Sequence, residues 1–272
     1  MANSILVIGA SGKQGNAVIH QLLEDGWKVR AFTRDRENKR LTNINNSSLE
    51  IIEGDLSNEE DLKLAMKNQY GLYSVQPIIP NDVEQELYQG KLIIETAEKQ
   101  NIQHTVYSTA GGVNRNRKGP HFETLAEIEN LLGESSLNHT IIKPSFFMDN
   151  FLRIVNVEND YISIPAFIKP DIKFAMISSI DIAKVAANIF KEASKYNHQA
   201  IEIASDELTL NEVVSTFEKV TGKNTEIKGE FTNQTAEKSW LEQKGYLIDF
   251  KKVTAINPTK LNLESWIKEN FS

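Results

Sequence analysis

The chain has 272 residues, of which 40% are hydrophobic and 25% are charged, a balance typical of folded globular proteins rather than disordered or fibrous ones. It contains no cysteine, which excludes disulfide scaffolds, zinc ribbons, iron–sulfur clusters and thiol nucleophiles. The net charge of −7 repels nucleic-acid phosphates, so we expect no direct nucleic-acid binding. The first apolar run, Ile5 to Ile8, is too short for a signal peptide or a membrane span, so we expect a cytoplasmic protein with no membrane segment.

Short apolar runs alternate with helical patterns through the first half of the chain. Ile5 to Ile8 predicts a buried parallel strand, and apolar residues recur at helical spacing from Asn16 until Gly26 ends the pattern. Further strands are expected at 28–33, 49–53, 71–75, 104–108 and 140–143, and further helices at 59–66, 83–99 and 123–132. Strands that alternate with helices form right-handed βαβ units, so we predict an α/β fold built on a doubly wound, parallel Rossmann-type sheet.

The pattern changes after Pro144. Residues 145–175 are rich in aromatic residues, Pro and Asn without a clear period, which indicates loops and short strands over the ligand end of the sheet. A helix is expected to run to residue 193, followed by a strand at 200–204 and a helix at 210–221. We therefore divide the chain into a dinucleotide-binding domain, 1–145, and a smaller C-terminal α+β region, 146–272. The second region would carry the substrate or partner site as a lid and return some segments to the first.

A glycine-rich turn joins the first strand to the first helix. Residues 9–15 read G-A-S-G-K-Q-G, a G-x-x-G-x-x-G spacing. Gly9 permits a tight turn, Gly12 lets the backbone approach a pyrophosphate, and Gly15 allows the helix to pack against the strand. The free N–H groups and the dipole of the helix favour an anion. Such turns also occur without ligands, but this position in an alternating α/β pattern favours a dinucleotide.

The residues after the second strand select the dinucleotide. Sites specific for NAD place an acidic side chain here, against the ribose 2′-hydroxyl. In this chain Thr33 is followed by Arg34, whose guanidinium can pair with a 2′-phosphate and stack on adenine. We therefore predict that NADP(H) is preferred over NAD(H). The alternative is that Arg34 is solvated and Asp35 binds the ribose.

Two more strand ends fit a bound nucleotide, because ligands of such sheets bind at the carboxyl ends of the strands. Asp55 and Leu56 follow the third strand, where a carboxylate and a backbone N–H can meet the adenine. Asp55 could equally cap the helix that begins at Glu59. Gln76 and Pro77 follow the fourth strand and are expected beside the cofactor.

Six segments of the chain together resemble the NmrA-like group of atypical short-chain dehydrogenases/reductases: G-A-S-G-K-Q-G, F-T-R-D, G-D-L, H-T-V-Y-S-T, P-H-F-E-T-L-A-E-I-E and K-P-S-F-F-M-D-N-F. The resemblance covers essentially the whole chain and implies a Rossmann domain, a smaller substrate domain and, usually, NADP(H). The cofactor contacts that it implies, together with the glycine turn, are Gly9, Ser11, Gly12, Lys13, Gln14, Gly15, Thr33, Arg34, Asp55, Leu56, Gln76 and Pro77. By the same resemblance, the nicotinamide end is lined by Thr109, Ala110, Pro144 and Phe147.

The chain departs from this family pattern in the segment 120–125, which reads P-H-F-E-T-L. Reducing members of the wider superfamily carry Tyr and Lys four residues apart on this helix, and His121 and Leu125 hold that relation here. Leu125 cannot donate a proton, and loss of a positioned general acid costs about 10²–10⁴-fold in rate, so ordinary carbonyl reduction is not expected. His121 is the candidate for a substitute acid, since an unperturbed histidine titrates at about 6.5. The alternative is a histidine that is solvated or bonded locally.

These observations leave three functions open. The first is an NADP(H)-binding protein without the Tyr/Lys pair, which senses the redox cofactor and signals to a regulatory protein partner, or weakly reduces a quinone-like molecule held by proximity. The second is a competent NADPH-dependent oxidoreductase of a quinone or carbonyl, with His121 or water as proton donor. The third is a binding scaffold whose nucleotide site is empty.

An apolar wall for a quinone could come from the aromatic segment after the last predicted strand of the first domain. Its candidates are Phe146, Phe147, Met148, Phe151 and Phe167. The alternative is that these side chains form ordinary core. The five histidines, at 20, 104, 121, 139 and 198, show no metal-ligand spacing, so no metal is predicted.

Overall fold

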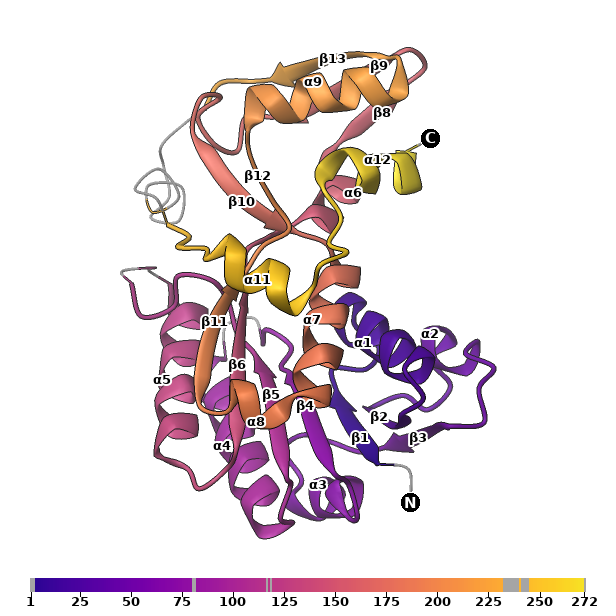
Figure 1. The fold of residues 1–272 in the computed structure, drawn as a ribbon, viewed down its shortest axis with the longest axis vertical. Helices are drawn as coiled ribbons and strands as arrows, with labels where there is room; N and C mark the ends of the chain where they lie inside the picture. Colours follow the sequence, from indigo (N-terminus) through magenta and orange to yellow (C-terminus); the bar gives the residue numbers. More distant parts are fainter. Residues whose placement is uncertain are drawn as a thin grey trace.

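The computed structural model describes residues 3–79, 82–115, 117, 119–231, 240 and 245–271. Its larger body is built on a seven-stranded parallel sheet (Figure 1). The strands are β1 (Ser4–Ile8), β2 (Lys28–Thr33), β3 (Leu49–Glu53), β4 (Gly71–Val75), β5 (His104–Ser108), β6 (His139–Pro144) and β11 (Gln199–Ile203). Their order is β11-β6-β5-β4-β1-β2-β3, which confirms the predicted Rossmann-type fold.

Helices cover both faces of this sheet, because the side chains of each strand alternate between two cores. On one face, Ile5 and Val7 of β1 pack against α1 (Lys13–Glu24) and α7 (Ser179–Lys191). On the other face, Leu6 and Ile8 pack in the core formed with α3 (Glu59–Met66), α4 (Val83–Lys99) and α5 (Pro120–Glu134). Three short helices complete this body: α2 (Lys39–Thr42), α8 (Ala193–Tyr196) and α11 (Phe250–Ile256).

A smaller body lies beyond the carboxyl-terminal edge of the large sheet (Figure 1). It contains two three-stranded sheets, of order β12-β10-β7 and β13-β9-β8. Its elements are β7 (Phe146–Phe147), η1 (Met148–Asn150), α6 (Phe151–Ile154), β8 (Asn156–Glu158), β9 (Tyr161–Pro165), β10 (Lys173–Ile177), β12 (Asp206–Thr209), α9 (Leu210–Thr221), β13 (Asn224–Lys228) and α12 (Leu263–Phe271). The chain returns to the large body twice between these elements, first for α7, α8 and β11, which pairs with β6, and then for α11.

The aromatic segment proposed as a quinone wall is part of the protein core. Phe146 stacks on Phe167 with ring centroids 5.2 Å apart, and Met148 and Phe151 are fully buried in the same cluster of the smaller body. Phe147 packs against the core of the large sheet instead. Ordinary core packing therefore describes Met148 and Phe151, whereas Phe146, Phe147 and Phe167 pack against the core with part of their surface exposed.

Two helices begin earlier than their apolar spacing predicts. Helix α1 begins at Lys13 rather than Asn16, and α5 begins at Pro120 rather than Glu123. In both cases a glycine is the N-cap, and the first residues that follow, Lys13-Gln14-Gly15 and Pro120-His121-Phe122, do not yet show the apolar period of the helix. Proline at the start of α5 fits this position because its missing N–H has no intrahelical partner there. Among the described helices, none is long and apolar enough to cross a membrane.

Candidate functional site

The glycine turn between β1 and α1 forms a cradle without side chains. Gly9 has a φ of +78°, and a Cβ placed on it would lie 2.4 Å from the carbonyl oxygen of Val75. A Cβ on Gly15 would lie 2.2 Å from the carbonyl oxygen of Gly9. Gly12 caps α1 with extended backbone and makes no side-chain bond to the first turn. An uncapped helix start approached by bare backbone suits a phosphate group, so these residues fit the pyrophosphate of a dinucleotide.

Gln14 turns away from this cradle and into the sheet. Its side chain is 7% exposed, and Nε2 donates to Oγ of Ser108 at 2.5 Å and to the hydroxyl of Tyr73. Burial raises the pKa of Tyr73 well above its ordinary value. Gln14 therefore ties α1 to β4 and β5, and only its backbone is left for the predicted cofactor contact.

Arg34 is exposed at the end of β2, as the sequence predicts. Thr33 Oγ1 accepts a hydrogen bond from the backbone N–H of Asp35 at 3.2 Å, and Asp35 Oδ1 accepts one from the backbone N–H of Glu37 at 3.0 Å. The Asp35 carboxylate therefore stabilises its own turn. This favours Arg34 over Asp35 as the side chain that meets an adenosine ribose.

Arg40 is a site residue that the sequence did not identify. Its Nη1 donates to the carbonyl oxygen of Ser11 at 3.0 Å, and its own carbonyl accepts from Nδ2 of Asn16 at 3.0 Å. A second guanidinium thus lies against the glycine turn. The sequence marks this position by the basic cluster that follows Arg34. Helix α2 has a single turn, which is too short to show a helical spacing of apolar residues. Arg40 and Lys13 also line a cavity of about 570 Å³ beside α1.

The segment after β3 is held by local turns. Asp55 Oδ1 accepts from the backbone N–H of Ser57 at 2.8 Å, while the Asp55 N–H donates to Oδ2 of Asp61 at 2.9 Å. Helix α3 is capped by Asn58, so the alternative in which Asp55 caps it is wrong. Leu56 packs against the core beneath α3 and α4.

Gln76, after β4, also points inward. Its side-chain Nε2 donates to the carbonyl oxygen of Glu86 at 3.0 Å, and its Oε1 accepts from the hydroxyl of Tyr107. A Cβ on Gly90 would lie 2.9 Å from Gln76 Oε1, so glycine in the middle of α4 permits this close approach. Pro77, the next residue, is exposed.

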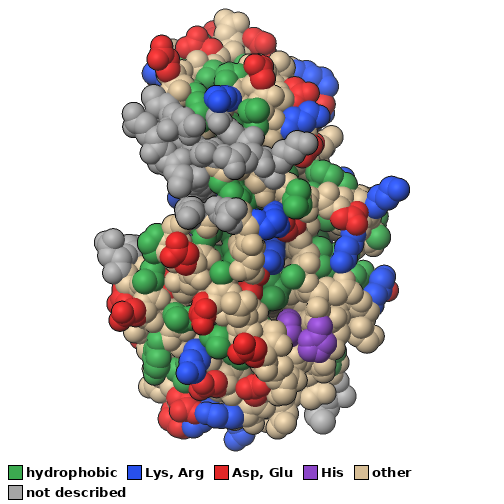
Figure 2. Space-filling view, turned by 90° about the vertical axis from the view of Figure 1, so that its left-hand side faces the viewer, with side chains coloured by type: hydrophobic (Ala, Val, Ile, Leu, Met, Phe, Trp, Pro, Cys, Tyr) green, Lys and Arg blue, Asp and Glu red, His purple; other side chains and the backbone are tan. Residues whose placement is uncertain are grey.

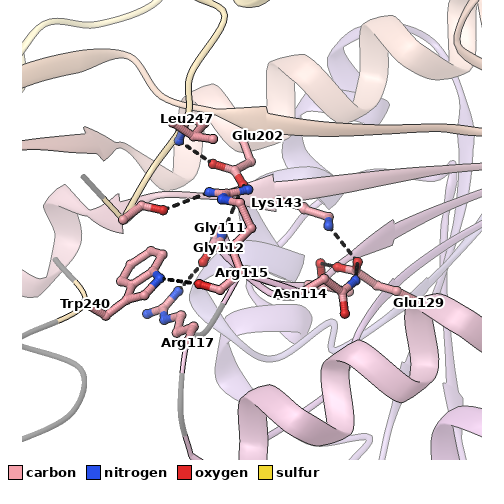
Figure 3. Close-up of polar contacts among 12 residues, drawn as sticks. Gly111, Gly112, Asn114, Arg115, Arg117, Glu129, Lys143, Glu202, Trp240 and Leu247 are labelled. Carbon is pink, nitrogen blue, oxygen red and sulfur yellow. Dashed lines mark hydrogen bonds and ion pairs between the residues drawn. The ribbon is translucent and has the colours of Figure 1, made fainter. Parts of the chain in front are cut away.

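The expected nicotinamide end contains a buried ion pair (Figure 3). Glu129 of α5 accepts from Nζ of Lys143 at 2.6 Å, from Oγ1 of Thr109 at 2.7 Å and from Nδ2 of Asn114 at 2.8 Å. Glu129 and Lys143 are 7% and 8% exposed. The residues after β5 run beside β6, where the N–H of Thr109 bonds to the carbonyl of Ile142. Thr109 and the residue after it, Ala110, are therefore placed beside the end of β6.

Two aromatic side chains pack against the turn after β5, and Trp240 is drawn in Figure 3. A Cβ on Gly112 would lie 1.8 Å from the Trp240 ring, and a Cβ on Gly111 would lie 2.6 Å from the Tyr246 ring. The Trp240 indole N–H donates to the carbonyl of Arg115 at 2.9 Å. Trp240 is therefore held to this turn both by its ring and by its indole N–H.

Glu202 of β11 links the turn after β5 to Leu247. Its carboxylate pairs with Arg115 and accepts from the N–H of Gly112 at 3.1 Å and of Leu247 at 2.8 Å (Figure 3). Gly111 in turn donates to the carbonyl oxygen of Pro144 at 2.9 Å. Trp240, Tyr246, Glu202 and Arg115 were all missed by sequence reasoning, since nothing in the sequence pairs positions so far apart.

His121 begins α5 and points toward α4. Its Nδ1 lies 2.6 Å from Oε1 of Glu86, whose side chain is 1% exposed, while the His121 side chain is 25% exposed. Leu125, one turn later, is buried. The expected substitute acid therefore has a carboxylate partner rather than a cation. No group of three side chains in the described parts of the chain could hold a metal ion.

Charged side chains of both signs are intermixed over the face shown in Figure 2. This distribution agrees with the dispersed basic residues of the sequence. Lys13 and Arg40 line one cavity beside α1, where Lys13 Nζ donates to the carbonyl oxygen of Asp149 at 3.3 Å.

The chain is similar to several known proteins. The NAD(P)H azoreductase of Xenophilus azovorans is 25% identical over 221 residues, covering 80% of this chain and 74% of that protein. NmrA, a negative transcriptional regulator solved in complex with NADP, has a TM-score of 0.85 at 17% identity, covering 99% of this chain and 95% of that one. The quinone oxidoreductase QOR2 of Escherichia coli, solved with NADPH, has a TM-score of 0.79 at 18% identity, covering 98% and 100%.

At these identities the solved structures show the fold alone. The sequence model of the NmrA-like family, however, matches residues 1–256, which is most of the chain. This protein therefore belongs to the NmrA-like family.

Proposed function

We propose that the protein binds NADP(H) and reduces a flat, conjugated carbonyl acceptor of the quinone type. The observation that carries the proposal is the bare-backbone cradle at the start of α1, with the Arg40 guanidinium bonded to it. The N–H groups of the α1 start would hold the pyrophosphate. The names of the azoreductase and quinone oxidoreductase relatives support the choice of acceptor class.

The preference for NADP(H) over NAD(H) is part of this proposal. Arg34 and Arg40 lie on the side of the turn that follows β2, where the adenosine ribose of a dinucleotide belongs in this fold. Two guanidinium groups favour a dianionic 2′-phosphate, and Asp35 is already engaged in its own turn. This local positive charge offsets the net negative charge of the chain.

Bound NADPH supplies a hydride. The residues of this chain must then orient the acceptor, exclude water and deliver one proton. Tyr246 is half-buried over the turn after β5 and offers aromatic surface to a flat acceptor, while Trp240, 6% exposed, packs behind it against Gly112. His121 is the proposed proton donor, through Nε2.

A second candidate is a regulator that senses the cofactor and signals to a protein partner. It is favoured by Leu125, which is 4% exposed and occupies the position of the usual lysine. A protein of this kind would bind NADP(H) tightly and turn over poorly.

Titration with NADPH and NADH tests the cofactor assignment. Arg34→Ala and Arg40→Ala should each weaken NADPH binding about tenfold or more and leave NADH binding nearly unchanged, because a charge-assisted hydrogen bond contributes about 1.5–3 kcal/mol. Arg36→Ala is the matched control, since Arg36 is exposed in the same segment. Tighter binding of NADH than of NADPH by the unaltered protein contradicts the preference.

A screen of quinones, azo dyes and carbonyls then tests the activity through the loss of NADPH absorbance. Turnover above about 1 s⁻¹, the low edge of ordinary enzymes, supports the reductase. Tight NADPH binding with no turnover on the panel supports the regulator.

A further inference from the structure

We infer that Glu86 is a positioning residue that fixes the orientation of His121 and keeps a proton on its Nδ1, so that the doubly protonated ring donates its other proton from Nε2. The inference rests on the proposed reductase function. Glu86 is not among the residues that the sequence or the family resemblance indicated, and it acts only through His121.

The geometry of the pair is specific. Glu86 Oε1 lies 2.6 Å from His121 Nδ1, a short distance typical of a charge-assisted hydrogen bond. Within the described residues, this bond engages Nδ1 and none engages Nε2. Because Nδ1 is occupied, Nε2 is the ring atom left for a substrate. A carboxylate that fixes one imidazole nitrogen and leaves the other for chemistry is a recurrent catalytic arrangement.

Glu86 itself is held rigidly. The backbone carbonyl of Glu86 accepts a hydrogen bond from the side-chain amide of Gln76, and the Gln76 side-chain oxygen accepts one from the buried hydroxyl of Tyr107. These bonds connect the second turn of α4 to the ends of β4 and β5. The carboxyl ends of β4 and β1 are neighbours in the sheet, so the pair lies on the edge that carries the glycine turn.

The burial of Glu86 is costly if its role is only to pack. Its side chain is 1% exposed, and Oε2 is buried without a hydrogen-bond partner in the described parts of the chain. A buried carboxylate with one unsatisfied oxygen destabilises the fold relative to an apolar side chain. Its ionic contact within the described residues is to His121, which is partly exposed at the ligand edge. A functional constraint on His121 explains why a carboxylate occupies this position.

The step is balanced with one donor and one cofactor. The acceptor carbon or ring takes a hydride from NADPH, and its carbonyl oxygen takes the Nε2 proton of the doubly protonated His121, which becomes the neutral Nδ1–H ring, so the acceptor gains two electrons and two hydrogens. Glu86 keeps the proton on Nδ1 throughout. His121 regains its Nε2 proton from water, which reaches its partly exposed ring.

Kinetics on the full chain test the inference with three variants. Glu86→Gln and His121→Asn should each lower kcat about 10²-fold or more while KM and the Kd for NADPH stay within about twofold, since only proton delivery is affected. The double variant should be no slower than His121→Asn alone, because the two residues act as one unit. Glu84→Gln is the control, an exposed glutamate on the same helix. Fully additive losses in the double variant contradict the inference.

Two measurements that need no activity complete the test. At a pH high enough to leave the ring neutral, nitrogen NMR of cofactor-free protein should show His121 as the Nδ1–H tautomer, and Glu86→Leu should lose that preference. Glu86→Leu should also melt at the same or a higher temperature, because it removes a buried charge. A large fall in melting temperature, or an unchanged tautomer, assigns Glu86 a structural role instead. If the unaltered protein reduces nothing on the panel, the proposed function fails, while the tautomer still decides whether Glu86 positions His121.

Discussion

At the scale of single residues, a substitution at Gly12 should affect cofactor binding but not folding. Its φ of −76° suits any residue, and the nearest atom to an added Cβ is the Gly9 carbonyl oxygen at 3.2 Å. Gly12→Ala should therefore change the free energy of unfolding by less than about 1 kcal/mol but weaken NADPH binding at least tenfold, because the methyl group occupies the phosphate approach. Chemical denaturation and titration measure the two effects. If Gly12→Ala and the unaltered protein bind NADPH with equal affinity, the glycine turn is not part of the cofactor site.

Gly133 is the matched control for that substitution. It lies in α5 with open space around its Cβ position. Gly133→Ala should leave NADPH affinity unchanged and raise the free energy of unfolding by about 0.5–1 kcal/mol, because alanine has less unfolded-chain entropy to lose.

The sequence predicts the backbone part of the site better than its side chains. The local sequence is enough to indicate Gly9, Gly12, Gly15 and Arg34. A turn between a strand and a helix is formed by residues that are adjacent in the chain. The partners of His121 and Lys143 come from distant positions and depend on how helices pack. The side chains of Gln14 and Gln76 point into the protein rather than toward the predicted cofactor site. Their hydrogen-bond partners are distant in the sequence, so the sequence does not reveal this orientation.

At the scale of elements, the start of α7 joins both bodies through one carboxylate. Asp181, 1% exposed, accepts from Ser178 Oγ at 2.9 Å, Ser205 Oγ at 2.6 Å, Asn257 Nδ2 at 2.9 Å and the Leu261 N–H at 3.0 Å. Asp181→Ala should lower the free energy of unfolding by about 3 kcal/mol or more, because several buried donors lose their acceptor. Denaturant unfolding measures it.

Asp171→Ala is the comparison for this prediction. Asp171 is exposed and bonds only to Asn211 among the described residues, so its loss should change the free energy of unfolding by no more than about 0.5 kcal/mol. If both variants lose the same stability, the carboxylate of Asp181 does not join the elements.

The elements that the sequence predicts are those with a repeating apolar pattern. Strand β5 and helix α4 have the same bounds in the structure as in the prediction. Strands β12 and β13 and helices α11 and α12 were not predicted. They are short or lie at the periphery, and tertiary contacts rather than a period in the sequence determine them.

At the scale of the whole molecule, stability should depend on pH through the buried histidines at the amino ends of β5 and β6. His104 is 1% exposed and donates to Thr140 Oγ1, whose own proton goes to the carbonyl of Tyr196. Burial, with smaller contributions from His139 and His198, lowers the pKa of His104 to about 4.

The unfolded chain therefore binds a proton at His104 near pH 6.5, whereas the folded chain binds it only near pH 4. Between these values the unfolded state holds more protons, so stability falls as pH is lowered through this window, by about 3 kcal/mol in total. Unfolding curves from pH 7 to pH 4 should show this slope, and His104→Gln should reduce it. His20→Gln, at an exposed position on α1, should leave the slope intact. An unchanged slope in His104→Gln would assign the pH dependence to other groups.

The Asp181 contacts also have a consequence for synthesis. A ribosome adds about 5–20 residues per second, so residues 257 and 261 leave it several seconds after residue 181. Until then the Asp181 carboxylate lacks its hydrogen-bond donors from Asn257 and Leu261. Before β11 emerges, the edge of β6 that pairs with it is open. An open strand edge pairs readily with other chains. The nascent protein should therefore need protection by a chaperone late in translation, and premature release should yield aggregates rather than a working nucleotide fold.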